Sequence, residues 1–180
     1  EFTADPICAY LDKQYMLGDS LLVAPVFNDE GIVNYYLPEG RWTDYFTGDV
    51  KTGSRYIKEK HGYLSIPLLV KEGSIIAVGN MDDNAEYDYS DGIILKAYEL
   101  IDQVPTSTVV YNGKAQSEVK AEIIKKDSEV YINVESEHPY TVVLVNVTNI
   151  ASVENGSYEI KGHDTIIMPF GKGEIICKLN

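Results

Sequence analysis

The second half of the chain, residues 93–180, is a series of short apolar stretches separated by turn residues. Val130, Ile132 and Val134 alternate with polar residues, which predicts a strand with one buried face and one solvated face. Residues 141–145 are almost wholly apolar, as expected for a strand inside the fold. Short strands at this spacing are typical of an antiparallel β-sandwich.

Two Asn–Gly pairs mark turns in this half of the chain. Asn112–Gly113 follows a predicted strand over residues 108–111, and Asn155–Gly156 precedes another apolar stretch. Both residue types tolerate positive φ, which a two-residue hairpin requires. The pattern therefore predicts a β-hairpin at each pair.

The first residues carry the pattern of a helix over residues 5–17. Asp5 can cap free backbone N–H groups, and Pro6 suits the first turn. Apolar residues then recur at helical spacing, and Gly18 can end the helix in a left-handed conformation. This is the one helix that the sequence predicts.

From residue 19 onward the pattern is that of strands. They are predicted over residues 21–26, 34–37, 42–46, 63–70 and 74–78, with turns at Pro, Gly and Glu between them. These strands predict a first antiparallel β-sandwich over residues 19–80.

Residues 81–92 differ in composition, because they contain five acidic residues and no basic one. Such a segment is typical of a solvated linker. We therefore expect an all-β chain of two antiparallel β-sandwich domains preceded by one short helix, with the first sandwich over residues 19–80, an acidic linker over 81–92 and the second sandwich over 93–180.

The charge and the cysteines bear on partners and compartment. A formal net charge of −13 argues against nucleic acid and against an anionic membrane surface. No apolar run approaches the ~18 residues of a membrane span.

Cys8 and Cys177 lie in apolar settings and are predicted to be free thiols, which favours a reducing, cytoplasmic compartment. The start at Glu1 without Met suggests a piece trimmed from a longer protein, so the lack of a signal peptide carries little weight.

Candidate catalytic and metal-binding residues do not form a recognisable pattern. Sugar hydrolysis needs two facing carboxyl groups, and no distinctive pair stands out. The acidic segment lacks the spacing of an EF-hand, and His61, His138 and His163 have no His or Cys at zinc spacing. We therefore predict no catalytic, cofactor-binding or metal-binding residue and no cofactor.

Aromatic residues are the one compositional feature that points toward a ligand. Tyr35, Tyr36, Trp42, Tyr45 and Phe46 lie close together in the sequence. Flat aromatic faces can stack on sugar rings, but aromatic residues also favour strands for packing alone. Buried side chains would indicate packing, and a coplanar exposed row would indicate a sugar-binding platform.

A succession of motifs resembles the C-terminal region of family 31 glycoside hydrolases, above all the α-xylosidase type. The motifs are DP at residues 5–6, YLD at 10–12, QYMLGDSLLVAPVF at 14–27, YLPEGRWT at 36–43, GSR at 53–55, HGYLSIP at 61–67 and AVG at 77–79. They cover residues 1 to about 80, and beyond that the likeness lies mostly in length and strand pattern.

The resemblance implies a place after the catalytic (β/α)8 barrel of a retaining α-glycosidase that uses no metal. Residues 1–18 would then be the end of the barrel, followed by a proximal and a distal β-sandwich. The catalytic aspartates of the family lie on earlier barrel segments, so the resemblance assigns no functional residue to this chain. It implies a parent glycoside hydrolase acting on α-xylosides or α-glucosides.

Our leading hypothesis is therefore a pair of accessory domains that pack against the absent barrel, meet oligosaccharide only through the parent enzyme, and contribute to homo-oligomer contacts. Such a piece would expose an apolar patch around residues 5–17 and would be inactive alone. One alternative is a carbohydrate-binding β-sandwich module, and another is an Ig-like interaction domain.

Overall fold

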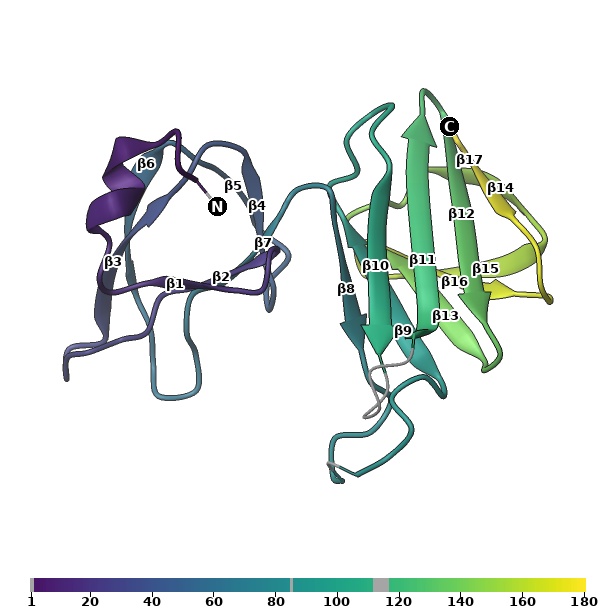
Figure 1. Ribbon diagram of the computed structural model, residues 1–180. Coiled ribbons are helices and arrows are strands. Elements are labelled where there is room, and N and C mark those ends of the chain that lie inside the picture. Colours follow the sequence, from purple (N-terminus) through teal and green to yellow (C-terminus); the bar gives the residue numbers. More distant parts are fainter. Residues whose placement is uncertain (1, 85, 112–116) are drawn as a thin grey trace. The chain divides into compact units, whose positions relative to one another are not determined.

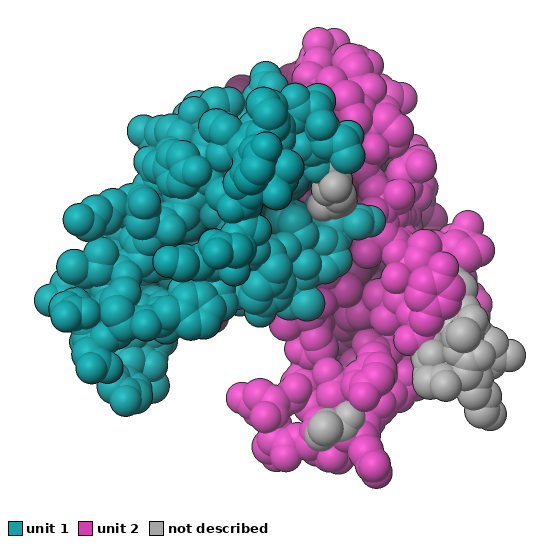
Figure 2. Space-filling model, turned by 60° about the vertical axis from the view of Figure 1, so that its left-hand side comes forward, with its two compact units in different colours: residues 1–72 teal, residues 73–180 magenta. Residues whose placement is uncertain are grey.

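The protein forms two compact units, which are described separately. The computed structural model describes residues 2–84, 86–111 and 117–180. The first unit is Glu1–Glu72 and the second is Gly73–Asn180 (Figure 2). The regular structure is almost entirely β (Figure 1), which confirms the predicted all-β class. Among these residues, no helix has the length and apolarity needed to span a membrane.

The predicted helix over residues 5–17 is wrong in kind and in length. Asp5 does cap a helix by accepting a hydrogen bond from the Ile7 backbone N–H at 3.0 Å, but this is a 3₁₀ helix of Pro6–Tyr10. Leu11 is extended and ends it, and β1 (Tyr15–Leu17) pairs with β2 (Leu21–Val23). The pairing satisfies backbone groups that a continued helix would have used.

In the first unit, one sheet has the strand order β1-β2-β7-β4-β5, and a smaller sheet pairs β3 with β6. All of these neighbours are antiparallel. The remaining bounds are β3 (Ile32–Leu37), β4 (Arg41–Asp44), β5 (Val50–Thr52), β6 (Arg55–Lys60) and β7 (Leu68–Lys71).

The core of the first unit joins its two sheets. Tyr35 and Leu37 from β3 belong to one buried cluster with Leu22, Trp42 and Leu69 from the larger sheet. The Trp42 side chain is fully buried, and its Nε1 donates a hydrogen bond to the Pro38 carbonyl at 3.0 Å. Burial of a side chain this large contributes several kcal/mol of apolar stabilisation to the unit.

The second unit is a sandwich of two sheets, with strand orders β10-β11-β12-β17-β14 and β15-β16-β13-β9-β8. Its strands are β8 (Ser74–Val78), β9 (Ile93–Tyr98), β10 (Thr106–Tyr111), β11 (Ser117–Lys126), β12 (Glu129–Ser136), β13 (Tyr140–Leu144), β14 (Ile150–Glu154), β15 (Gly156–Lys161), β16 (Asp164–Pro169) and β17 (Ile175–Leu179).

One hydrophobic core lies between these two sheets. Val130 and Ile132 are buried in it, as the alternating pattern predicts, and they pack with Leu95, Leu144 and other residues of the opposite sheet. The paired strands are antiparallel except for β9 and β13, which run parallel. The predicted sandwich is therefore confirmed, with one parallel pair that the sequence pattern did not indicate.

The predicted boundary between the domains does not agree with the strand pairing. Residues 74–80 were assigned to the first sandwich, but β8 pairs with β9 in the second unit, from Ser74 opposite Tyr98 to Val78 opposite Ile94. The acidic segment 81–92 therefore joins two neighbouring strands of one sheet and is not a linker between domains. Acidic composition indicates solvent exposure, which a hairpin loop and a linker share.

The two Asn–Gly predictions have different outcomes. Asn155 does adopt positive φ, at 61°, but β14 pairs with β17 whereas β15 pairs with β16. The Asn155–Gly156 turn thus passes the chain from one sheet to the other, and the predicted hairpin there is wrong. Asn112–Gly113 lies outside the described residues, although the flanking strands β10 and β11 pair antiparallel.

A glycine between β5 and β6 provides a test of the first unit's packing. A Cβ atom at Gly53 would lie 1.7 Å from the Pro38 carbonyl oxygen, so Gly53→Ala forces the backbone apart. We expect a loss of about 1–3 kcal/mol in the free energy of unfolding. Urea denaturation followed by the fluorescence of Trp42, the single Trp of the chain, measures this loss.

Gly62→Ala is the matched control, because a Cβ atom there meets nothing within 4 Å. We expect it to leave the free energy of unfolding nearly unchanged. Equal destabilisation by both substitutions would contradict the close approach of Gly53 to Pro38.

Candidate functional site

The first unit carries a groove on its surface, with a volume of about 520 Å³. Its apolar part includes Tyr10, Phe27, Ile32 and Tyr56, and its polar part consists of Asp12, Lys13, Gln14, Asn28 and Asn34. Tyr10 is 86% exposed and Phe27 is 71% exposed. Aromatic side chains this exposed are typical of a surface that packs against another protein segment. We call Tyr10, Phe27, Ile32 and Tyr56 the apolar groove.

Further apolar side chains of the first unit are exposed outside the groove. Tyr63 and Leu64 are fully exposed on the loop between β6 and β7. Tyr15 and Leu17 are more than half exposed on β1, which is an edge strand of its sheet. An edge strand with exposed apolar side chains readily pairs or packs with another chain.

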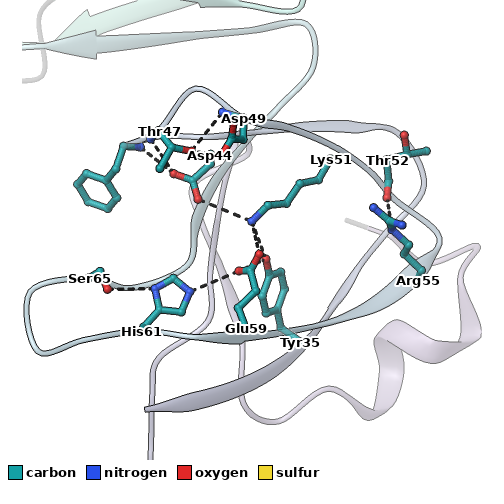
Figure 3. A network of polar contacts seen from close by, with 11 residues as sticks. Tyr35, Asp44, Thr47, Asp49, Lys51, Thr52, Arg55, Glu59, His61 and Ser65 are labelled. Atoms are coloured by element: carbon teal, nitrogen blue, oxygen red, sulfur yellow. Dashed lines mark hydrogen bonds and ion pairs between the residues drawn. The ribbon is translucent and has the colours of Figure 1, made fainter.

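A partly buried polar network lies where the two sheets of the first unit meet (Figure 3). Lys51 Nζ lies 2.7 Å from Glu59 Oε1 and 3.7 Å from Asp44 Oδ2, and it donates a hydrogen bond to the Tyr35 hydroxyl at 3.2 Å. The Tyr35 hydroxyl in turn donates to Glu59 Oε2 at 2.9 Å. His61 Nε2 lies 3.4 Å from the same oxygen. We call these five residues the Lys51 network.

The surroundings of Glu59 keep it ionised. Burial by itself would raise the pKa of Glu59, but hydrogen bonds from Lys51 and Tyr35 outweigh it and lower the pKa below its ordinary value. Burial of Tyr35, together with the hydrogen bond to Glu59, raises the pKa of the Tyr35 hydroxyl. Lys51 thus compensates the charge of a partly buried carboxylate.

This geometry does not suit acid–base catalysis. Asp44 and Glu59 share Lys51, but a glycosidic general acid needs a raised pKa, and that of Glu59 is lowered. Asp44 Oδ1 is already engaged, because it accepts hydrogen bonds from the backbone N–H groups of Phe46 and Thr47. The network therefore stabilises the fold. Across the described residues, His, Cys, Asp and Glu form no group of three or more that could hold a metal ion.

The aromatic residues singled out in the sequence do not form a common platform. Trp42, Tyr35 and Tyr36 are buried. Tyr45 and Phe46 meet edge-to-face with an interplanar angle of 88°, so they present no coplanar row. The three buried side chains therefore serve packing, whereas Phe46 is 63% exposed but forms no coplanar row with Tyr45.

The other candidate residues are scattered. His138 Nε2 lies 3.7 Å from Asp88 Oδ2 in the second unit, and His163 is exposed on the turn between β15 and β16. Cys8 and Cys177 are both free, as predicted. The Lys51 network was missed because its members come from four separate strands and the turn after β6, and no local spacing connects them.

The network makes stability depend on pH. Because the pKa of Glu59 is lowered in the folded state, its contribution is present above the unfolded value of about 4.3 and is lost as the pH falls through the folded value. We expect Glu59→Gln to lower the free energy of unfolding by about 1–2 kcal/mol at pH 7, and by less below pH ~4. Urea denaturation of both proteins across this range measures the difference.

Glu39→Gln is the control, because Glu39 is an exposed carboxylate of the same unit. It should change the stability little at any pH. A Glu59→Gln penalty that stays constant from pH 7 to pH 3 would contradict the role given to the ionised carboxylate.

Comparison with known proteins accounts for both units. Residues 1–76 match the family model described as the glycosyl hydrolase family 31 C-terminal domain, and residues 88–179 match that of the alpha-xylosidase YicI C-terminal domain. The alpha-xylosidase XylQ of Lactiplantibacillus pentosus is 36% identical over 124 residues, and an alpha-xylosidase of Emericella nidulans is 35% identical over 136 residues.

The fold is also similar to solved structures. The GH31 dextranase of Flavobacterium johnsoniae superimposes with a TM-score of 0.80 at 19% identity, over 98% of this chain and 28% of that one. The matches to the two alpha-xylosidases cover 67% and 71% of this chain but only 16% of each relative. Two consecutive C-terminal family models thus account for nearly the whole length, and the chain belongs to the C-terminal region of family 31 of the glycoside hydrolases.

Proposed function

We propose that the two units are accessory domains of an α-glycosidase and that the first unit packs against the catalytic barrel of that enzyme. The observation that carries the proposal is the apolar groove. Tyr10 and Phe27 expose most of their surface in a unit that otherwise buries a regular core. Burying such side chains stabilises an interface by roughly 25 cal/mol per Å² of apolar surface.

The parent enzyme would act on α-xylosides or α-glucosides. Relatives named alpha-xylosidase and alpha-glucosidase both match this chain, and the chain spans only about a sixth of the first of them. We propose that parts of the parent outside these 180 residues select the substrate and that the chain is inactive alone. A cytoplasmic location and a part in homo-oligomer contacts belong to the same proposal.

The carbohydrate-binding module is the second candidate. Its predicted platform rested on Trp42 and its neighbours, and Trp42 is fully buried. The accessory role is therefore favoured at this position, because a buried indole cannot stack on a sugar ring.

Hydrolysis by the purified chain tests inactivity. With 4-nitrophenyl α-D-xyloside and α-D-glucoside, we expect nitrophenol release no faster than in buffer, because the pKa of Glu59 is lowered and a general acid needs a carboxyl group with a raised pKa. Hydrolysis that co-purifies with the chain and is abolished by Glu59→Gln would contradict the proposal.

Self-association tests the groove. Without a catalytic barrel, the chain leaves its apolar groove uncovered. We therefore expect the weight-average sedimentation coefficient of the chain to rise with concentration. Phe27→Asp should shift the chain toward the monomer. The matched control is Phe170→Asp in the second unit, since Phe170 is 77% exposed and Phe27 is 71% exposed.

The control substitution should leave the self-association unchanged. A wild-type chain that stays monomeric at every concentration, or equal effects of the two substitutions, would refute a docking role for the groove.

A further inference from the structure

The second unit contains a pocket lined by tyrosines at one end of its sandwich. The pocket has a volume of about 400 Å³, within the range of small-molecule sites. Its lining residues come from the loop between β8 and β9, the end of β10 and the start of β11, and Figure 1 shows these segments at the same end of the sandwich. Its lining residues, which we call the tyrosine pocket, are Tyr87, Asp88, Tyr89, Ser90, Val110, Tyr111 and Glu118.

Two tyrosines of the pocket are partly exposed to solvent. Tyr111 is 58% exposed and Tyr89 is 47% exposed. Tyr87 and Tyr89 meet edge-to-face with ring centroids 4.9 Å apart. The interplanar angle of 88° means that Tyr87 and Tyr89 form no coplanar row, so the pocket can offer a ligand single ring faces and not a flat platform.

The loop that supplies most of the pocket is held by specific contacts. Asp88 Oδ1 accepts hydrogen bonds from the Ser90 backbone N–H at 3.0 Å and from its hydroxyl at 2.6 Å, and Ser90 is buried. A Cβ atom at Gly79 would lie 1.6 Å from the Tyr87 hydroxyl, so the absence of a side chain there gives Tyr87 its position. The Gly92 backbone N–H donates to the Pro139 carbonyl at 3.0 Å.

The polar groups of the pocket are suited to hydroxyl groups. Asp88 and Glu118 belong to the lining of the pocket, and carboxylate oxygens can each accept more than one hydrogen bond. Hydrogen bonds from Ser90 lower the pKa of Asp88, so its carboxylate remains ionised. The five acidic residues of segment 81–92 would repel an anionic ligand. His138 lies 3.7 Å from Asp88 Oδ2 and partly balances the charge there when it is protonated.

We propose that the tyrosine pocket binds a neutral saccharide, with a sugar ring stacked on Tyr89 or Tyr111 and its hydroxyls donating to the carboxylates. Sugar rings have an apolar face of C–H groups and a rim of hydroxyls, which matches aromatic faces beside hydrogen-bond acceptors. This gives the second unit a substrate-tethering role that does not depend on docking by the first unit.

Titration of the isotopically labelled 180-residue chain with isomaltotriose and with α-D-xylosyl-(1→6)-D-glucose tests this site. We expect amide resonances of segment 86–92 and of Tyr111 to shift, with a Kd on the order of 1 mM. At least one of the substitutions Tyr89→Ala and Tyr111→Ala should weaken binding about tenfold, because it removes the stacking face. Tyr89→Phe should retain binding.

Two further variants separate the pocket from general effects. Tyr158→Ala removes a partly exposed tyrosine of the same unit outside the pocket and should leave the Kd unchanged. Gly79→Ala substitutes no lining residue, but its Cβ atom should displace Tyr87 and thereby weaken binding.

Several results would overturn the proposal. The first is no shift with either saccharide, and the second is shifts that survive both alanine substitutions. The third comes from a titration with a lysine-rich peptide: if only this peptide produces shifts, the acidic loop binds a basic partner and not a sugar. None of these results bears on the groove of the first unit, which the hydrolysis and self-association experiments test separately.

Discussion

The first unit depends on packing its two-stranded sheet against its larger sheet. An isolated pair of strands such as β3 and β6 is marginally stable in water, so it needs a face to cover. Trp42, Leu22 and Leu69 supply that face, and Tyr35 and Leu37 fill it from the other side. The Lys51 network then joins β3, β4, β5 and β6 at the margin of this core, where a wholly apolar contact would leave the Tyr35 hydroxyl without a partner.

The sequence predicts most strands of the second unit because burial within a strand has a local signature. Val130 and Ile132 alternate with polar residues, and the structure buries them in the second core. In the first unit it missed β5 and β6, which have few buried side chains, and the strand predicted over residues 63–70 begins only at Leu68. Errors arise where a local pattern serves more than one topology. Asn155 has the positive φ of a hairpin, yet the strands that it joins belong to different sheets. The acidic residues 81–92 indicated exposure correctly, but the pairing of β8 with β9 is a long-range property that composition does not contain.

The helix prediction failed for a related reason. Asp5 and Pro6 do start a helical turn, but β1 follows and pairs with β2, and this pairing decides the backbone conformation of Tyr15–Leu17. The tyrosine pocket lay outside sequence reasoning as well. Its residues come from positions 87–90, 110–111 and 118, and only the meeting of a loop with two strand ends brings them together. Sites assembled in this way have no spacing that can be recognised in one sequence.

The two units thus present different surfaces. Exposed Tyr10 and Phe27 of the first unit suit a permanent protein contact, whereas the tyrosine pocket of the second unit suits a small polar ligand. Both features fit a chain that spans only about a sixth of its alpha-xylosidase relatives.

The most direct test of the accessory role is the intact mass of the natural protein, captured from its source cells with an antibody against this chain. The account predicts a polypeptide several times longer than 180 residues that carries the barrel. A natural polypeptide of about 20.1 kDa would contradict it.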